Sequence, residues 1–549
     1  MSRLYFFIIA LGLFQASTLS AQKTNSGGGG INDQSQDVIK NFDARLIESE
    51  KVKMNPILPP IDTTTKVQTY TVPDKVIPVN YIPPKMRPIG IATKKPDPGY
   101  NGYAKIGYGF PNSPYGELAY RYSDPGNFIL GGKAKYFGMD NATIANQSFS
   151  NLNVEGNGTF FAKDVGLAVD GTVGYNSDTR NYYGYDHTKY TETKETSKQN
   201  FNTFYAGAKA YNSARTVADI NYGLGANFYK LNDNFGAQET DFNIRLEGTK
   251  WFAEKFPLTV ILRTEFTSFD STGGKTQSLN NIYLQPSFTY KTDELSVKIG
   301  ANLVSSNDIF YPKPDIEASY KIAGQSLAVF AGWKGDLTKN TYRQLTNYNP
   351  YIFPQTKIKN TERTEYYGGI KGEIANLNYS AQVGYSNNYN LPLYLSDSTD
   401  RFRRFNVLYD SVNIFNIRGS VSYRPIAKLE IIGTLSQNVY TLKREIAAWG
   451  LPSLDVNLSG KFTAYEVGDQ KAILKAALFV QNGVNYKNAQ GVATRLDGLF
   501  DINIGGEYWF ARNIGAFLDI NNLLNIKRER WQFYPNYGMN ILGGITARF

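Results

Sequence analysis

The chain contains no cysteine and only one histidine, His187. Without cysteine it cannot form disulfides, thiolate metal sites or thiol nucleophiles, and it cannot carry a lipid anchor on an N-terminal cysteine. It also lacks any run of about 18 apolar residues beyond its N-terminus, which excludes helical membrane spans. No phosphate-binding loop, dinucleotide fingerprint or zinc-ligand spacing is present. The sequence therefore predicts no cofactor and no bound metal.

The single histidine lies in a stretch that reads NYYGYDHTKY, directly after Asp186. A hydrolase built on a histidine base needs a nucleophile or an activated water beside that base. Residues adjacent in sequence rarely form such a catalytic pair. We therefore predict that the protein is not an enzyme, and we assign no catalytic, cofactor-binding or metal-binding residue.

Charge of one sign is also never concentrated. Lys and Arg number 58 against 48 Asp and Glu, which gives a formal net charge of +10. The basic residues are interleaved with acidic ones along the whole chain. Nucleic-acid-binding proteins carry basic blocks or stripes, so the sequence predicts no nucleic-acid partner.

Aromatic residues and glycine are abundant, with 40 Tyr, 33 Phe and 50 Gly among 549 residues. From Tyr103 onward, apolar and polar residues alternate with a period of two, as in FDINIGGEYWF at residues 500–510. The same alternation recurs at residues 240–250, 258–267 and 365–374. This pattern predicts strands with one apolar face, although a soluble sandwich would show it too.

The lengths of the connections separate a membrane barrel from a soluble sandwich. About 22 strands of roughly 10 to 14 residues fit between residues 101 and 549, which is the length of a tilted transmembrane strand. Short turns are expected near residues 163–165, 212–215, 253–255, 291–294, 323–325, 375–378, 424–428, 467–470 and 511–513. Longer links alternate with them near residues 138–149, 176–199, 269–280, 336–361, 388–406, 441–454, 484–497 and 525–538. Short periplasmic turns alternating with long external loops are typical of outer-membrane barrels.

The predicted fold class is therefore all-β, a large antiparallel transmembrane β-barrel of about 22 strands. Pro286, Pro312 and Pro314 fall within expected strands. Because proline cannot donate to a sheet ladder, we expect these residues at rims or bulges.

Two segments precede the barrel. Residues 1–21 have a short positive region with Arg3, an apolar region and Ala21, which together predict a cleaved signal peptide and export to the outer membrane. Residues 22–100 are rich in proline, which disfavours sheet and favours extended chain. We expect this segment to be an extended periplasmic or lumenal stretch that contacts periplasmic or envelope proteins.

The C-terminal residues 541–549 read ILGGITARF and predict an amphipathic last strand that ends at Phe549. Such a strand is what the outer-membrane assembly machinery usually binds, and the barrel exterior would contact outer-membrane lipid. The last 37 residues resemble the closing strands of TonB-dependent receptors. The resemblance rests on the NNLLN run at residues 521–525, on Trp531, Tyr534, Pro535 and Gly538 of the following link, and on Phe549.

The family resemblance implies a 22-stranded barrel that transports a solute across the outer membrane. The sequence departs from the family in its N-terminal part, because the stretch before the first strand is proline-rich and has no plug-domain pattern. The chain therefore resembles a plugless or reduced relative of the kind found in Bacteroidota. The alternative function is a non-transporting barrel that serves as the scaffold of a secretion or assembly complex.

Without a plug, three arrangements of the lumen are open: inward-folded external loops such as 336–361, a threaded N-terminal segment, or an open channel. Charged pairs of mixed sign are expected to face the lumen, namely Arg245 with Glu247, Arg263 with Glu265 and Lys371 with Glu373. Mixed charge argues against a strongly ion-selective pore. Aromatic residues in two long links are expected to form either a recognition surface or the upper aromatic girdle. They are Tyr182, Tyr183, Tyr185, Tyr190, Tyr348, Tyr351 and Phe353.

Overall fold

The computed structural model describes residues 99–549, apart from residues 142 and 215. The expected signal peptide and almost all of the expected extended segment therefore lie outside the described residues. No helix among the described residues is both long and apolar enough to span a membrane.

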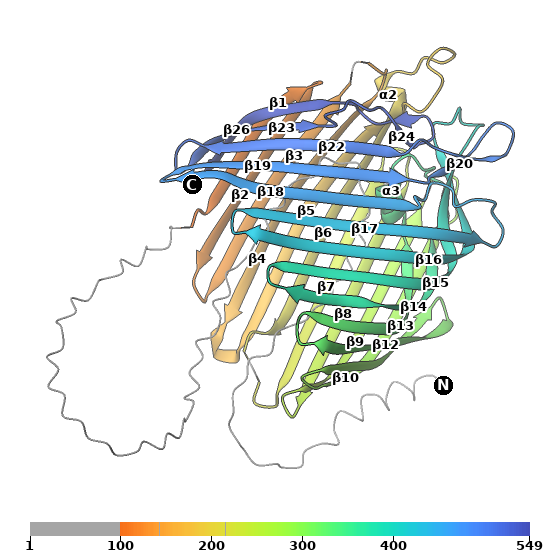
Figure 1. Ribbon diagram of the computed structural model, residues 1–549. Coiled ribbons are helices and arrows are strands. Elements are labelled where there is room, and N and C mark those ends of the chain that lie inside the picture. The colour runs from red at the N-terminus through yellow and green to blue at the C-terminus, as the bar shows by residue number, and fades with distance from the viewer. Residues whose placement is uncertain (1–98, 142, 215) are drawn as a thin grey trace, which may run out of the picture. The chain divides into compact units, whose positions relative to one another are not determined.

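A single antiparallel sheet of 22 strands makes up the body of the molecule (Figure 1). Each strand pairs with the next barrel strand in the chain. The first strands are β1 (Gly102–Phe110), β2 (Ser113–Asp124), β3 (Phe128–Asp140), β4 (Ser148–Ala162), β5 (Leu167–Asn181), β6 (Lys198–Asn212), β7 (Ile220–Asp233), β8 (Gln238–Phe252), β9 (Phe256–Asp270), β10 (Gln277–Lys291) and β11 (Leu295–Ser306). The others are β12 (Ile309–Ala323), β13 (Leu327–Asn340), β14 (Lys359–Ile374), β15 (Leu377–Ser396), β16 (Phe405–Ile426), β17 (Leu429–Leu442), β18 (Leu454–Val467), β19 (Gln470–Asn482), β22 (Leu499–Trp509), β23 (Ile514–Asn521) and β26 (Asn540–Arg548).

The sheet closes on itself where β1 pairs with β26, in a register that places Ile106 opposite Ile545. Phe549 extends this closure, because its backbone N–H donates to Gly102 O over 3.0 Å and its carbonyl accepts from Gly102 N–H over 2.6 Å. The phenyl ring stacks on Tyr120 at 6.4 Å. Gly102 leaves the space for that ring, since a Cβ there would lie 2.2 Å from a ring carbon. The predicted fold class is confirmed.

The outer face of the barrel is apolar and the inner face is polar. On β8, for example, Phe242 and Leu246 are exposed on the outside of the barrel. Asp241 of the same strand is buried on the inside. Exposed apolar side chains recur around the barrel, among them Ile106, Leu130, Val173, Phe204, Ile299, Ile370, Phe415 and Leu474. An exposed apolar surface of this extent is the surface that a transmembrane barrel presents to lipid.

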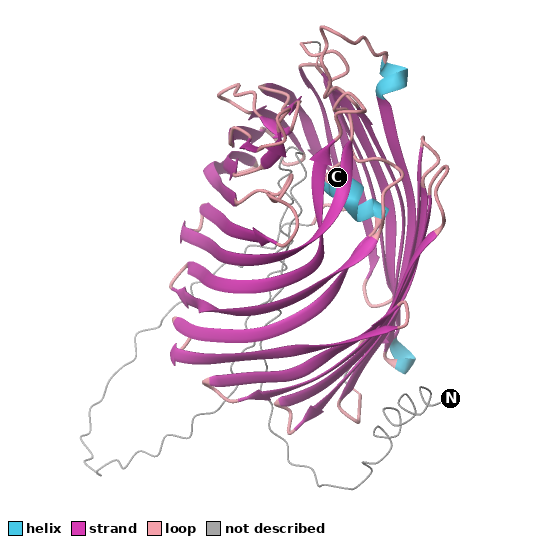
Figure 2. Cartoon of the chain, turned by 90° about the vertical axis from the view of Figure 1, so that its right-hand side faces the viewer, coloured by secondary structure: helices cyan, strands magenta, loops and turns pink. Residues whose placement is uncertain are grey.

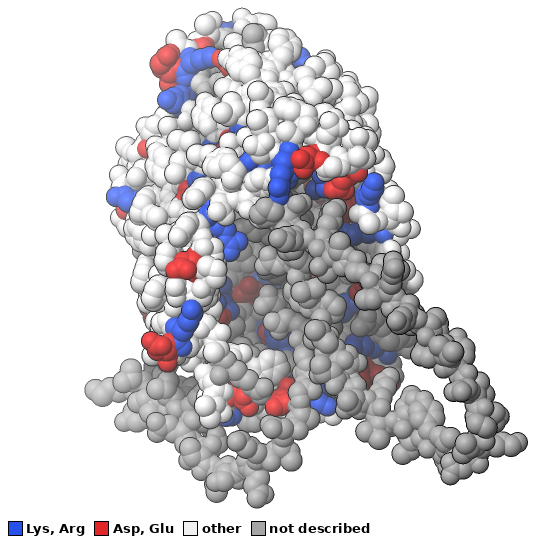
Figure 3. All heavy atoms as spheres, turned by 90° about the vertical axis from the view of Figure 1, so that its left-hand side faces the viewer, with Lys and Arg blue, Asp and Glu red and all other residues white. Residues whose placement is uncertain are grey.

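Charged residues gather at the ends and inside. Figure 3 looks at the end of the short turns and shows side chains of both signs on this end of the barrel. Two of the expected lumenal pairs form: Arg245 Nε lies 3.0 Å from Glu247, and Arg263 Nε lies 3.6 Å from Glu265. The third expected cation, Lys371, contacts the ring of Phe330 at 5.5 Å. Mixed charge therefore lines the inner wall.

The alternation of short and long connections is confirmed at most positions. The exceptions are residues 213–219, a longer connection at the short-turn end, and residues 271–276, a shorter link than expected at the opposite end. One end of the barrel carries the short turns, such as residues 375–376, 427–428 and 468–469. The opposite end carries the long links 141–147, 182–197, 341–358, 397–404, 443–453, 483–498 and 522–539. The short links 111–112, 234–237 and 307–308 also lie at that end, as their place in the alternation predicts.

The long links contain regular structure of their own. They hold the helices α2 (Lys194–Ser197) and α3 (Tyr342–Tyr348), and the short strands β20 (Asn485–Lys487), β21 (Ala493–Arg495), β24 (Glu529–Trp531) and β25 (Tyr534–Pro535). A 3-10 helix, η1 (Lys163–Val165), forms one of the short turns.

Two expectations about strands need correction. Strands β15 and β16 have 20 and 22 residues and run well beyond the expected length, so the link between them is only 397–404. Pro286 lies in the middle of β10 and not at a rim or a bulge. It pairs with Val260 of β9, and the ladder to β11 is interrupted between Leu284 and Ser287 without a change of register. Residues 285 and 286 have no partner in the ladder to β11, and this interruption accommodates the backbone N–H that Pro286 lacks.

Pro312 and Pro314 do lie at a rim. Both pair with β11, whereas the pairing of β12 with β13 begins only at Asp315. The missing N–H groups therefore face a side of the strand that has no partner there.

Candidate functional site

The link 341–358 folds inward at the long-link end of the barrel. Its helix α3 lies inside the ring of strands in Figure 2, which is turned so that the right-hand side of Figure 1 faces the viewer. The helix begins with a capping box, in which the Thr341 hydroxyl accepts from Gln344 N–H at 3.2 Å and the Gln344 side chain accepts from Thr341 N–H at 3.3 Å. This reciprocal pair satisfies two N–H groups that a helix start leaves free.

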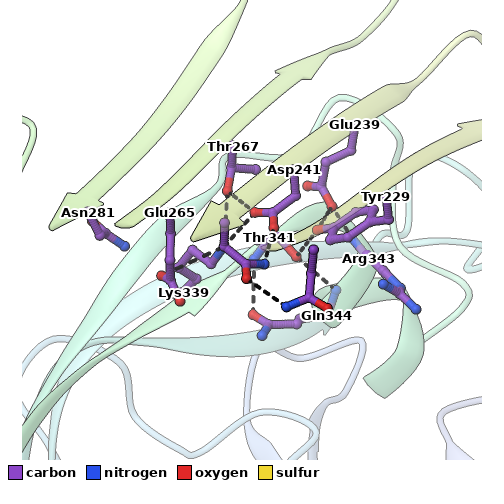
Figure 4. Close-up of polar contacts among 12 residues, drawn as sticks. Tyr229, Glu239, Asp241, Glu265, Thr267, Asn281, Lys339, Thr341, Arg343 and Gln344 are labelled. Carbon is purple, nitrogen blue, oxygen red and sulfur yellow. Dashed lines mark hydrogen bonds and ion pairs between the residues drawn. The ribbon is translucent and has the colours of Figure 1, made fainter. Parts of the chain in front are cut away.

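The inner wall holds the start of α3 through Glu239 of β8 (Figure 4). The Glu239 carboxylate is fully buried and accepts from the backbone N–H groups of Tyr342 at 2.5 Å and Arg343 at 3.1 Å. It also accepts from the Tyr229 hydroxyl at 2.8 Å. A buried carboxylate needs such partners, and free helix N–H groups supply them. The contact fixes α3 to the wall.

A buried ion pair lies directly before the link. Lys339 at the end of β13 places its ammonium 2.5 Å from Asp241 and 3.7 Å from Glu265. The Thr267 hydroxyl donates to the same Asp241 carboxylate at 2.6 Å. Removing one partner of such a pair leaves a buried charge without compensation.

Tyr342 completes the attachment on this side. Its ring stacks on Phe269 of β9 at 4.9 Å, and its hydroxyl donates to Asp233 of β7 at 2.8 Å. Burial raises the pKa of Tyr342 well above its usual value, so the hydroxyl stays a donor at any physiological pH.

The other end of the link contacts a distant part of the barrel. Tyr348 packs its ring on Tyr394 of β15 at 4.9 Å and on Trp531 of β24 at 5.6 Å. The Arg530 guanidinium donates to the Tyr348 hydroxyl at 3.1 Å and to Gly450 O at 3.2 Å. Strands β7–β9 and the links around β24 lie far apart in the strand order of the closed sheet. The link 341–358 therefore crosses the mouth of the barrel.

Other long links pack on this crossing link through aromatic rings. Tyr351 stacks on Tyr534 of β25 at 3.8 Å, and Tyr183 meets Tyr534 edge-on at 4.8 Å. The Tyr183 hydroxyl donates to Pro535 O at 2.9 Å. Burial raises the pKa of both Tyr183 and Tyr534 well above the usual value. We refer to the links 182–197, 341–358, 397–404, 443–453 and 522–539 together as the loop layer.

Ion pairs also hold parts of the loop layer together. Glu192 lies 3.0 Å from the guanidinium of Arg401 and 3.4 Å from that of Arg403. Arg403 is also 2.9 Å from Asp400, and hydrogen bonding to Asp400 raises its pKa despite partial burial. These pairs join the link 182–197 to the link 397–404.

The aromatic residues singled out in the sequence have a role other than the two expected. Tyr182, Tyr183, Tyr185 and Tyr351 are at most 6% exposed, so they form neither a recognition surface nor a membrane girdle. They are buried within the loop layer because the links fold onto one another. Only Tyr190 is exposed, and Arg401 covers its ring at 4.3 Å.

His187 lies on the outer part of this layer and faces no nucleophile. Its Nε2 lies 3.0 Å from Tyr183 O, and its ring packs on Tyr185 at 4.2 Å. The neighbouring Asp186 instead accepts from Thr188, a bond that lowers the pKa of Asp186 to about 2, aided by Lys189. Among the described residues, no group of three or more potential ligands is placed to hold a metal ion.

No protein-family model matches the sequence, and no curated protein does. Solved structures do match. The FrpB iron transporter from Neisseria meningitidis has a TM-score of 0.63 at 9% identity, with 82% of each chain covered. A mutant ferric enterobactin receptor (PfeA) from Pseudomonas aeruginosa in complex with enterobactin has a TM-score of 0.62 at 12% identity, covering 82% of this chain and 81% of that one.

A third match is the ferripyoverdine receptor of the Pseudomonas aeruginosa outer membrane, with a TM-score of 0.58 at 13% identity, covering 83% of this chain and 72% of that one. The chain has the barrel fold of TonB-dependent receptors. At these identities the likeness concerns the fold. The 22-stranded barrel of this chain is thus similar to all three in fold.

Proposed function

We propose that this TonB-dependent receptor-like barrel lies in the outer membrane and transports a solute through its lumen. The observation that carries the proposal is the pairing of an apolar exterior with a polar lumen that the loop layer covers at one end. Such an arrangement admits a solute only when the loop layer moves. The structural neighbours named above are receptors and a transporter, which supports transport and does not favour the non-transporting scaffold.

The proposal includes the segments that flank the barrel. Residues 1–21 would direct export, and residues 22–100 would contact periplasmic or envelope proteins. The last strand, which ends at Phe549, would bind the outer-membrane assembly machinery. A plugless or reduced receptor of the Bacteroidota kind remains our proposal for the family type, because the N-terminal sequence has no plug-domain pattern.

Neighbouring cysteines on β7 test whether the lumen is an aqueous pathway. The chain has no native cysteine, so a single introduced thiol reports on its own position. Asn227 faces the lumen, where its amide donates to Asn243 at 3.1 Å, and Ala226 faces the opposite side of the same strand. We expect Asn227→Cys in proteoliposomes to react with a water-soluble thiol reagent at least about tenfold faster than Ala226→Cys, because lipid excludes the reagent and the thiolate.

The same pair of variants in a chain that lacks residues 22–98 provides the control for that segment. Reaction only after truncation would place the segment in the lumen as a reduced plug. Equal, slow reaction of both positions in both chains would mean that the lumen holds no water path. That outcome would leave the scaffold function as the better account.

A further inference from the structure

The inner wall below α3 contains a recess of about 510 Å³. Its floor is formed by β6 and β7, where Gly207, Gly223 and Gly225 take lumen-facing positions. Glycine at these places removes the side chains that would otherwise fill the space. The recess is large enough for a small organic solute, and it faces the lumen at the middle depth of the strands.

Among the residues that line this recess, cations outnumber carboxylates. Lys209 and Arg245 share one carboxylate, Glu247, at 2.8 and 3.0 Å. The other carboxylate in the lining, Asp170, accepts from the hydroxyls of Thr159 and Tyr211. Arg343 adds a third cation to the lining.

Arg343 is the least satisfied of these cations. Its backbone N–H is fixed by Glu239, while its guanidinium lies over the ring of Tyr229 at 4.5 Å (Figure 4). No carboxylate among the described residues forms an ion pair with this guanidinium. The oxygens of Glu239 already accept from the Tyr229 hydroxyl and from the backbone N–H groups of Tyr342 and Arg343. The guanidinium is therefore available as a planar, two-pronged donor, the geometry that matches a carboxylate or a phosphate.

We propose that this recess binds an organic anion and that Arg343 donates to its carboxylate or phosphate group. Tyr205 and Tyr229 also line the recess. Their hydroxyls already donate to Glu155 and Glu239, so these two residues would contact the anion through their rings. The inference rests on the proposed function and names the class of solute. It also places a ligand contact on α3, so that the solute touches the link that crosses the mouth.

Isothermal titration calorimetry on the full chain in detergent at low ionic strength tests the proposal. The probes are citrate for the carboxylate class and inorganic phosphate for the phosphate class, with glucose as the neutral control. We expect one or both anions to bind, and Arg343→Gln to weaken the binding by about tenfold or more, as the loss of a charge-assisted hydrogen bond does. Arg343→Lys keeps the positive charge without the two-pronged guanidinium, so its affinity for the anion should lie between those of the native chain and of Arg343→Gln.

Two further variants separate a local site from general charge. Gly225→Val should weaken binding with every charge retained, because a Cβ at Gly225 meets only atoms 3.8 to 4.0 Å away and the larger side chain then fills the recess. Lys163→Gln removes the same charge at the short-turn end, on η1, and should leave binding unchanged. Heat-modifiable migration of each variant shows that the barrel has folded.

Calorimetry in detergent does not require transport, so its failure is distinct from failure of the proposed function. Binding of citrate alone or of phosphate alone would identify the class within the proposal. The proposal is overturned if the native chain binds neither anion, or if Arg343→Gln binds them as tightly as the native chain does.

Discussion

Replacing Trp531 by alanine is expected to loosen the loop layer while the barrel stays folded. The Trp531 ring is 5% exposed and packs against Tyr348, Tyr394 and Phe405 at centroid distances of 5.5 to 5.6 Å. Truncating a buried tryptophan costs about 3–5 kcal/mol. These contacts join β24 to the link 341–358 and to the adjacent ends of β15 and β16, and no pairing between barrel strands depends on them. The cost should therefore appear as local opening of the loop layer. Hydrogen exchange measured by mass spectrometry should show faster exchange in residues 341–358.

Trp333→Ala is the matched control for this variant. Trp333 lies on β13, is 42% exposed and stacks on Tyr366 of β14 on the outer face. Its loss removes the same side chain without touching the loop layer, so exchange in residues 341–358 should be unchanged. Unaltered exchange in the Trp531→Ala variant would show that the links are held together by other contacts.

Glu239→Ala is expected to release the start of α3 from the wall. The change removes the acceptor of two backbone N–H groups and of the Tyr229 hydroxyl, and each buried donor left without a partner costs about 1–3 kcal/mol. Trypsin cleaves after Arg343, which follows directly on this contact. We therefore expect cleavage at Arg343 to become at least about tenfold faster, since 1.4 kcal/mol shifts an opening equilibrium tenfold.

Glu239→Gln keeps the size of the side chain and one good acceptor, so its cleavage rate should fall between those of the native chain and of Glu239→Ala. If Glu239→Ala is cleaved at Arg343 as slowly as the native chain, the wall contact does not hold α3. The capping box of Thr341 and Gln344 would then be the stronger anchor.

The barrel could be predicted from the sequence because its pattern is local. Each strand alternates apolar and polar residues, and each connection shows its length directly, so residues 240–250 indicate both a strand and its two faces. Phe549 was informative for the same reason, since closure of the sheet depends on the last strand. The boundaries of two strands were predicted wrongly, as was the place of Pro286. Strands β15 and β16 extend beyond the expected length because they continue to pair with each other beyond a bulge near Asn388.

An inward fold of the link near residues 336–361 was one of three expected arrangements, but the contacts of the loop layer could not be predicted because they join residues far apart in the chain. Glu239 contacts Tyr342 across more than a hundred residues, and in the sequence it is simply one polar residue of an alternating strand. The sequence places Tyr183 and Tyr351 in a recognition surface or an aromatic girdle, but whether a side chain in a link is buried depends on which links meet.

Under the proposed function, the inner wall and the loop layer have separate roles. The charged pairs of the inner wall would favour water in the lumen, and the aromatic contacts of the loop layer would favour a closed mouth in the absence of solute. A solute that binds near α3 can shift the loop layer only if it binds the open arrangement more tightly than the closed one. Arg343 is placed for such a difference, because it belongs to the crossing link and lines the recess.

Conductance in planar bilayers tests the central claim, that the link 341–358 closes the mouth of a membrane-spanning barrel. The variant replaces residues 342–357 by a short glycine–serine link, and a control replaces the rim link 271–276 in the same way. Each is recorded with and without residues 22–98, which separates any contribution of that segment. The account predicts little conductance from the native chain and the control, and steady, many-fold larger conductance from the variant. A folded variant that stays silent in both forms, or a native chain that conducts as well as the variant, would contradict it.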